Sequence, residues 1–157
     1  MAWAVHIVDG SNPAEIRAVR ELWEAYWQSL GFARDFQHFD HELDALPGKY
    51  APPQGRLFLV RIDGHPAATA ALRPLSAETC EAKRLYVTPA YRGRGIAAAL
   101  MARLIEEART AGYRRICGDT FATMDTALAM YRRMGFVEVG PYSPDPTPGA
   151  LYLQLDI

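Results

Sequence analysis

Apolar side chains recur at helical spacing in two parts of the N-terminal third of the chain. The first part covers residues 12–31. Its apolar positions, spaced as on one face of a helix, are Ile16, Val19, Leu22, Trp23, Tyr26, Trp27 and Leu30. Asn12, followed by a proline, favours a helix start, and Gly31 favours the end of the helix. A second, weaker helix is expected over residues 36–46, because Pro47 breaks the pattern.

Apolar runs of strand length, separated by turn residues, occupy much of the remaining chain. They predict strands at residues 3–8, 56–63, 66–74, 79–87, 114–120, 136–139 and 151–157. The pair Asp63-Gly64 favours a hairpin between the second and third strands, and the fourth strand completes an antiparallel meander. Helical spacing returns at residues 96–112 and 125–134, and a glycine ends each of these segments. We therefore expect one α+β domain over residues 1–157, with a mixed, mostly antiparallel sheet and helices on both faces.

The charge and composition of the chain exclude several classes of protein. Its 17 basic and 18 acidic residues give a formal net charge of −1, whereas a nucleic-acid-binding protein usually has a clear basic excess. No apolar run reaches the roughly 20 residues that cross a bilayer, and the first residues lack the pattern of a secretion signal. Cys80 and Cys117 lie on separate predicted strands, without metal-binding spacing. We expect a cytoplasmic protein with reduced cysteines that binds neither nucleic acid nor membranes.

A glycine-rich turn lies between the predicted strand 79–87 and the helix that follows it. The turn reads Arg92-Gly93-Arg94-Gly95-Ile96-Ala97. Such a turn directs several backbone N–H groups at one point, at the positive end of the helix dipole. Glycine also lets a phosphate approach the backbone closely, and arginines at a helix N-terminus are unfavourable unless an anion lies between them. The turn therefore predicts a bound phosphorylated cofactor.

Two other phosphate-binding motifs fit this turn less well. A dinucleotide-binding motif needs a third glycine near the start of a parallel sheet. Here the third glycine is absent, and an antiparallel meander precedes the turn. A Walker-type loop ends in Gly-Lys-Ser/Thr, and this turn does not. A tight turn without a ligand is the remaining alternative.

The turn and two further segments resemble motifs of the GNAT family of N-acetyltransferases. The family's pyrophosphate motif is Arg/Gln-x-x-Gly-x-Gly/Ala, and residues 91–97 follow its bacterial variant, Tyr/Phe-Arg-Gly-x-Gly-Ile/Leu-Gly/Ala. Residues 85–89, Leu-Tyr-Val-Thr-Pro, resemble the hydrophobic strand before that turn. Residues 127–136 resemble the late signature Ala-x-x-x-Tyr-x-x-x-Gly-Phe. The resemblance covers nearly the whole chain and implies the GNAT (acyl-CoA N-acyltransferase) fold.

The resemblance implies that acetyl-CoA is the co-substrate and that no metal takes part. Backbone N–H groups of the turn would bind the pyrophosphate. Strand residues 85–87 would present backbone to the pantetheine arm, and the N–H of Val87 would polarise the thioester carbonyl. The implied cofactor-binding residues are Leu85, Tyr86, Val87, Arg92, Gly93, Arg94, Gly95, Ile96, Ala97, Met124 and Ala127. Met124 departs from the family, which often has asparagine there, so this contact is expected to be apolar or to shift to Thr123 or Asp125.

Tyr131 and Glu81 are the implied catalytic residues. In the family, the tyrosine that matches Tyr131 lies near the thioester sulfur and protonates the leaving thiolate; the alternative role is a tyrosine of the core. Glu81 is the candidate base for the acceptor amine, since some relatives have a glutamate at this strand position. Its separation from Val87 is even, so we expect both side chains on one face of the strand. The alternatives are an ion pair of Glu81 with Lys83 or Arg84, and a water chain as the base.

The implied reaction is direct transfer of an acetyl group to a primary amine of a small molecule or peptide. An acyl-enzyme is not expected, because both cysteines lie away from the expected thioester. Substrate recognition is assigned to Trp23, Tyr26, Trp27, Phe32, Phe36 and, within residues 141–148, Tyr142 and Asp145, although most of the aromatic residues should be core. Asp119 is expected either to hold a substrate cation or to cap the next helix. His38 and His41 fit a solvated helix face better than a metal site.

A non-catalytic protein on the same fold is the competing hypothesis. Such a protein would be an acyl-CoA sensor or a partner-binding module. Tyr131 argues against this function, whereas the departure at Met124 argues weakly for it. Acyl groups longer than acetyl remain a further option, and the protein is expected to be a monomer or a homodimer.

Overall fold

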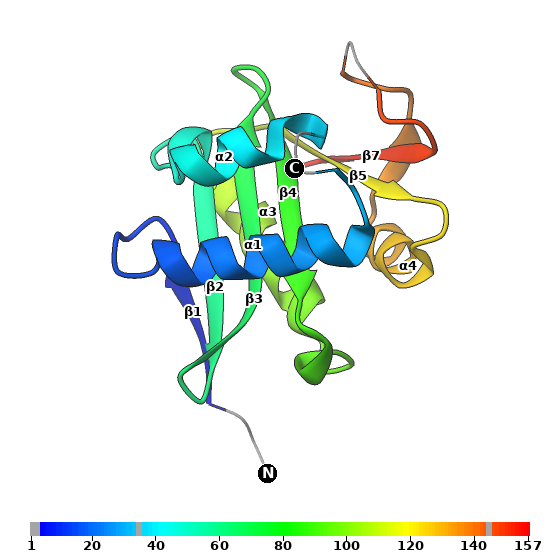
Figure 1. Cartoon of the computed structure of the whole chain (residues 1–157). Coiled ribbons are helices and arrows are strands. Elements are labelled where there is room, and N and C mark those ends of the chain that lie inside the picture. The colour runs from blue at the N-terminus through cyan, green and yellow to red at the C-terminus, as the bar shows by residue number, and fades with distance from the viewer. Residues whose placement is uncertain (1–3, 34–35, 144–145) are drawn as a thin grey trace.

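Seven strands form one sheet in the computed structural model, which describes residues 4–33, 36–143 and 146–157. The strands are β1 (Val5–Asp9), β2 (Arg56–Ile62), β3 (His65–Pro74), β4 (Thr79–Val87), β5 (Arg115–Phe121), β6 (Val137–Val139) and β7 (Ala150–Asp156). Their order across the sheet is β1-β2-β3-β4-β5-β7-β6 (Figure 1). Neighbouring strands are antiparallel, except that β4 and β5 are parallel.

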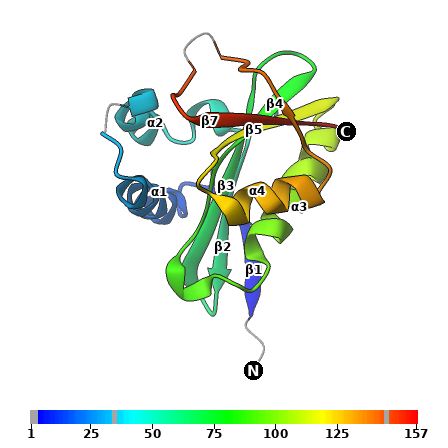
Figure 2. The same ribbon diagram turned by 90° about the vertical axis from the view of Figure 1, so that its right-hand side faces the viewer.

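Four helices within these described ranges cover the two faces of the sheet. α1 (Ile16–Leu30) and α2 (Phe39–Ala45) lie on one face, and α3 (Ile96–Thr110) and α4 (Asp125–Arg133) lie on the other (Figures 1 and 2). Short 3₁₀ turns occur at Phe36–His38, Gly48–Tyr50 and Pro89–Tyr91. The predicted α+β class is confirmed, and most predicted elements agree with the structure to within one or two residues.

The first helix begins later than the sequence predicts. Asn12 does not cap it. The Asn12 side chain instead accepts a hydrogen bond from the backbone N–H of Ala14 (3.1 Å) in a turn before the helix. Glu15, the expected partner in a capping box, pairs with Arg61 of β2 (2.6 Å). Asn12 therefore stabilises a turn before the helix, and Glu15 joins this turn to the sheet through an ion pair. α1 begins at Ile16.

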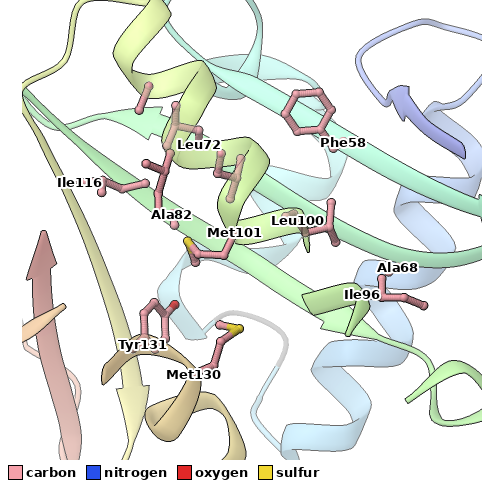
Figure 3. Close-up of a cluster of buried hydrophobic side chains, with 14 of the residues drawn as sticks. Phe58, Ala68, Leu72, Ala82, Ile96, Leu100, Met101, Ile116, Met130 and Tyr131 are labelled. Carbon is pink, nitrogen blue, oxygen red and sulfur yellow. The ribbon is translucent and has the colours of Figure 1, made fainter. Parts of the chain in front are cut away.

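A run of small residues in β3 lets helices pack closely on both faces of the sheet. The alanines of this run, all fully buried, are Ala67, Ala68, Ala70 and Ala71. Three of them belong to the core under α3, and Ala71 belongs to the core under α1. Figure 3 shows Leu100 and Met101 of α3 beside Met130 and Tyr131 of α4 in the first of these cores. The arrangement places the α4 tyrosine against the middle of the sheet.

A β-bulge in β4 changes which side chains share a face. Thr69 pairs with Tyr86, but Ala71 pairs with Lys83, so β4 contains one extra residue between these rungs. Arg84 lies in this interval with φ of 58°, in the left-handed region. The expectation that Glu81 and Val87 point to one side is therefore wrong, because the extra residue reverses the alternation. Glu81 faces the α1 and α2 side of the sheet.

The parallel strands β4 and β5 separate soon after they meet. They pair only from Thr79 with Arg115 to Glu81 with Cys117. β5 then stays paired with β7 as far as Phe121, while β4 stays paired with β3 as far as Val87. A wedge therefore opens between β4 and β5. Within it, the facing edges of the two strands no longer pair with each other.

Candidate functional site

The inner part of the wedge is a small cavity of about 80 Å³. Its lining includes Leu85 from β4, Thr120 from β5, and Met124, Ala127 and Tyr131 from the start and length of α4. Four of the predicted site residues, Leu85, Met124, Ala127 and Tyr131, thus come together here from two distant parts of the chain. The Met124 sulfur accepts a hydrogen bond from the Thr120 hydroxyl (3.4 Å), so this side of the cavity is partly polar despite the methionine.

The glycine-rich turn adopts the geometry that an anion site requires. Gly93 and Gly95 have φ of 78° and 77°, in the left-handed region that favours glycine. Gly95 is the N-cap of α3. The N–H groups of residues 96–98 lie in the first turn, where no helical carbonyl is available to them. Together with the helix dipole, these donors can bind a phosphate.

Arg92 ties the turn to the end of β4. Its Nε donates to the Val87 carbonyl (2.9 Å), and its guanidinium lies over the Tyr86 ring (5.7 Å to the centroid). Tyr86 itself faces α1 and packs against Tyr26 (ring centroids 5.1 Å apart). Ile96 is buried in the core under α3. The side chains of Tyr86 and Ile96 therefore pack within the protein. These two residues could contact a cofactor only through their backbone groups.

Tyr131 is buried with its hydroxyl against β5. The residue is 5% exposed, and its ring packs edge-on against Phe136 (centroids 4.9 Å apart). A Cβ atom built on Gly118 would lie 3.0 Å from the Tyr131 hydroxyl, so a side chain there would crowd the hydroxyl and glycine leaves it room. Burial, followed by the nearby negative charge of Asp119, raises the pKa of Tyr131. The phenol is therefore protonated at neutral pH and can act as a hydrogen-bond donor.

A larger cavity of about 960 Å³ adjoins the small one on the α2 side of the sheet. Residues 37–50, β3, β4, β5 and the segment 142–152 contribute to its lining. Gln37, Lys83, Arg84 and Asp119 line both cavities. These four residues mark the junction at which a molecule in the larger cavity would meet one in the wedge.

Glu81 lines the larger cavity and is 2% exposed. One carboxylate oxygen accepts a hydrogen bond from Arg73 Nε (2.6 Å), and the other accepts one from the Tyr142 hydroxyl (2.6 Å). Burial and then the charge of Glu81 raise the pKa of Tyr142. The alternative prediction, an ion pair of Glu81 with Lys83 or Arg84, is wrong, because Glu81 pairs with Arg73 on the neighbouring strand.

The two basic residues after Glu81 have other partners. Arg84 Nη2 lies 2.6 Å from Glu42 of α2, and Lys83 Nζ lies 3.9 Å from Asp119 of β5. Asp119 does not cap the next helix: the N-cap of α4 is Met124, with no side-chain capping bond. Asp119 lies at the junction of the cavities instead.

The predicted aromatic residues divide between core and cavity. Trp23 is fully buried and donates to the Thr69 hydroxyl (3.1 Å), whereas Trp27 and Phe36 reach the lining of the small and the large cavity, respectively. His38 and His41 line the large cavity from exposed positions. The predicted site residue Asp145 lies outside the described residues.

Sequence reasoning missed the partners that arrange the charges of the large cavity. Arg73 lies on β3, Glu42 on α2 and Lys49 in the turn after α2. No local motif marks these residues, because each contact joins segments that are distant along the chain. The signal that the sequence does offer is on β4, where two charged residues, Glu81 and Lys83, occupy alternate positions of a strand.

The chain is similar to known acetyltransferases in sequence and in fold. The acetyltransferase (GNAT) family model matches residues 16–136. An uncharacterized N-acetyltransferase of Schizosaccharomyces pombe is 33% identical over 148 residues, which cover 92% of this chain and 90% of that protein. The crystal structure of an acetyltransferase from Streptococcus agalactiae has a TM-score of 0.82 at 16% identity and covers 98% of both chains. That of YncA from Salmonella typhimurium, which contains acetyl-CoA, has a TM-score of 0.74 at 18% identity and covers 98% of this chain and 94% of that one.

The structural comparison shows that the sheet with its flanking helices has the GNAT fold. In the described part of the chain, no helix has the length and apolar character needed to cross a bilayer.

Proposed function

The chain belongs to the GNAT family of acetyltransferases, and from this we propose that it transfers an acetyl group from acetyl-CoA to a primary amine. One observation carries the proposal: the glycine turn follows the C-terminal end of β4, and Tyr131 lines the cavity in the wedge that opens beside the same strand. The turn would bind the pyrophosphate, and the pantetheine arm would lie along the unpaired edge of β4. The thioester would then reach the small cavity beside Tyr131.

The backbone of β4 supports this placement of the cofactor. The N–H of Thr88 donates to the Ala67 carbonyl on β3 (2.9 Å). Because backbone groups alternate along a strand, the N–H group of Val87, next to Thr88, points away from β3, into the wedge. This donor can bind the pantetheine arm or polarise the thioester carbonyl, the role predicted for it. Met124 and Ala127 would contact the same arm from α4.

In the proposed reaction the amine nitrogen attacks the thioester carbon directly. The C–N bond forms, the C–S bond breaks, and Tyr131 donates its proton to the leaving thiolate. The amine loses a proton to the Tyr142 oxygen, while Tyr142 passes its own proton to Glu81 along the 2.6 Å hydrogen bond. Glu81 is thus the proposed base, acting through Tyr142.

The cysteines support direct attack rather than an acyl-enzyme. Both are buried. Burial, followed by the influence of the other cysteine, raises the pKa of Cys80 to about 12, and burial, followed by the charge of Glu81, raises that of Cys117 to about 11. Neither thiol is therefore deprotonated at neutral pH, and the thiolate is the nucleophilic form of cysteine.

The cofactor site is tested by a glycine substitution. Gly95→Ala places a side chain on a left-handed residue, which costs roughly 1–2 kcal/mol and shifts the turn, so we expect about tenfold weaker acetyl-CoA binding by calorimetry. Gly64→Ala is the matched control, because Gly64 has φ of 82° in the β2–β3 hairpin, away from the wedge. Absence of any acetyl-CoA binding by the unaltered protein would refute the proposed function.

Release of coenzyme A distinguishes an enzyme from the competing non-catalytic protein. A thiol reagent measures this release while acetyl-CoA is mixed with a panel of amines. An acyl-CoA sensor would bind acetyl-CoA but release no thiol beyond slow hydrolysis with any amine. The same panel, run with longer acyl-CoA thioesters, tests the preference for acetyl.

The proposed base is tested by its pH profile. Glu81→Gln should lower kcat/KM about a hundredfold at neutral pH, the lower end of what a general base contributes. With the base removed, the reaction should depend on acceptor that is already deprotonated in solution, so the defect should shrink as the pH rises towards the pKa of the acceptor amine. Tyr142→Phe should give the same profile if the proton passes through Tyr142. A Glu81→Gln profile that matches the unaltered enzyme would assign the proton to a water chain instead.

A further inference from the structure

Among the residues that the structure describes, the larger cavity has more basic than acidic side chains in its lining. Four cationic side chains, from Lys49, Arg73, Lys83 and Arg84, stand against three carboxylates, from Glu42, Glu81 and Asp119. Arg84 and Arg73 are each paired at 2.6 Å with a carboxylate. The two lysines are less well matched, since Lys49 Nζ lies 3.6 Å from Glu42 and Lys83 Nζ lies 3.9 Å from Asp119.

Lys83 and Asp119 face each other near the narrow end of the wedge, where β4 and β5 begin to separate. Each lies two residues beyond the last rung at which β4 and β5 pair, Glu81 with Cys117. The Lys83 side chain is 9% exposed and that of Asp119 is 23% exposed. Their 3.9 Å separation is longer than a hydrogen bond, for which N···O distances of about 2.7–3.2 Å are usual. Both charges therefore retain capacity for a ligand at the junction of the two cavities.

The cations around Lys49 repel one another. Burial, followed by the positive charge of Arg73, lowers the pKa of Lys49, and Lys83 contributes in the same direction, while Glu42 opposes them. An anionic group among these side chains would relieve the repulsion. A second cation in the same place would add to it.

The geometry points to a free amino acid as the acceptor, an inference that rests on the proposed function. The carboxylate of the amino acid binds Lys83, with Lys49 beside it, and its ammonium group faces Asp119. In a zwitterionic amino acid the carboxylate and the ammonium group lie a few ångströms apart. The Lys83–Asp119 pair presents the complementary cation and anion, also a few ångströms apart. The amine is thereby held at the junction, next to the cavity that contains Tyr131.

This arrangement disfavours two other classes of acceptor. A polyamine or an aminoglycoside brings only positive charge to a cavity that already has a cationic excess. A peptide N-terminus has an amide in place of the adjacent carboxylate, so it would bring no second anion to Lys83.

The test compares acceptors that differ only in the carboxylate. Initial rates of thiol release are measured with the twenty free amino acids and, for the best of them, with its carboxamide and its decarboxylated amine. Spermidine is added as a cationic acceptor. We expect kcat/KM for the amino acid to exceed that for the carboxamide by about tenfold or more, as for a hydrogen-bonded charge pair.

Variants at Lys83 assign the preference to this residue. Lys83→Met should remove most of the roughly tenfold preference for the carboxylate over the carboxamide, and Lys83→Arg should retain most of it. Arg17→Met is the control for loss of a positive charge, because Arg17 lies on the exposed face of α1, 92% exposed. Acetyl-CoA binding, measured on each variant, verifies that it is folded.

The outcomes separate this inference from the proposed function. Thiol release that is equal or faster with the carboxamide, the plain amine or spermidine overturns the amino-acid acceptor but leaves the acetyltransferase in place. Failure of all twenty amino acids, with acetyl-CoA still bound, also overturns it. Failure to bind acetyl-CoA overturns the proposed function itself.

Discussion

Tyr131→Phe is expected to lower kcat about a thousandfold, within the range that general acids contribute, with little change in the Kd for acetyl-CoA. The substitution removes only the hydroxyl. The ring would keep its edge-on contact with Phe136 and its place in the core under α3. The loss should therefore fall on departure of the thiolate and not on folding or cofactor binding.

The position of the Tyr131 hydroxyl is the reason for expecting a large fall in kcat. It lies against Gly118, where the absence of a side chain leaves it room, in a buried cavity at the base of the wedge. Because burial and nearby negative charge raise the pKa of Tyr131, the phenol remains a donor throughout the neutral and moderately alkaline range. We expect no loss of activity at high pH from ionisation of this residue.

Two comparisons make the test specific. Tyr113→Phe is the matched control, because Tyr113 is another buried tyrosine, and its hydroxyl donates to the Gln54 carbonyl (2.8 Å). The defect of Tyr131→Phe should also shrink with an acetyl thioester whose thiol has a lower pKa, since that leaving group needs less help. An unchanged kcat with a good acceptor would remove Tyr131 from the mechanism.

Arg84→Met is expected to lower the free energy of unfolding by about 3–5 kcal/mol, the usual cost of removing one partner of a buried ion pair. The Arg84 side chain is 4% exposed and lies 2.6 Å from Glu42. Its guanidinium also lies over the Trp27 ring (4.8 Å to the centroid). The variant would leave the Glu42 carboxylate largely buried, with Tyr50 as its hydrogen-bond donor (2.8 Å) and Lys49 at 3.6 Å.

The pH dependence of this loss follows from Glu42. Burial alone would raise the pKa of Glu42, but the charge and hydrogen bond of Arg84, together with the Tyr50 hydrogen bond and the charge of Lys49, outweigh it, and the pKa is lowered overall. The pair therefore contributes stability above the ordinary pKa of glutamate, about 4.3, and loses it as the pH falls further. Without Arg84 the buried carboxylate can protonate readily, so the difference between the two proteins should shrink at acidic pH.

Urea unfolding at pH 7 and at pH 4 measures both effects. Arg17→Met is the control, because it removes an exposed pair with Glu21 that should contribute less than about 1 kcal/mol. The double variant Glu42→Gln with Arg84→Met should recover part of the stability, since it removes the unpaired charge. A loss below 1 kcal/mol in Arg84→Met would show that the ion pair does not hold α2 to the bulge.

The parts of the fold that the sequence predicts are those with local causes. The hairpin at Asp63-Gly64 and the turn at residues 92–97 depend on glycines whose backbone angles few other residues adopt. The helices follow from apolar spacing and from the glycines that end them. Tyr131 could be predicted as a site residue because its motif is local to α4.

The arrangement of the charged side chains has no such local cause. The bulge at Arg84 occurs without a glycine or proline, so nothing in the strand pattern predicts it, and it reverses the facing of the residues on either side. Glu42 and Arg84 are 42 residues apart, and Tyr142 is 61 residues from Glu81. Such contacts result from the packing of whole elements, and the periodicity of one element contains no information about them.

The wedge divides recognition into two chemically different halves. On the cofactor side the proposed donors are main-chain amides, which persist when side chains change. On the proposed acceptor side the groups are a few ionisable side chains from separate elements, such as Lys49 and Asp119. Substitution there can retune which molecule is acetylated without disturbing the scaffold that delivers the acetyl group, so a single framework can serve many acceptors.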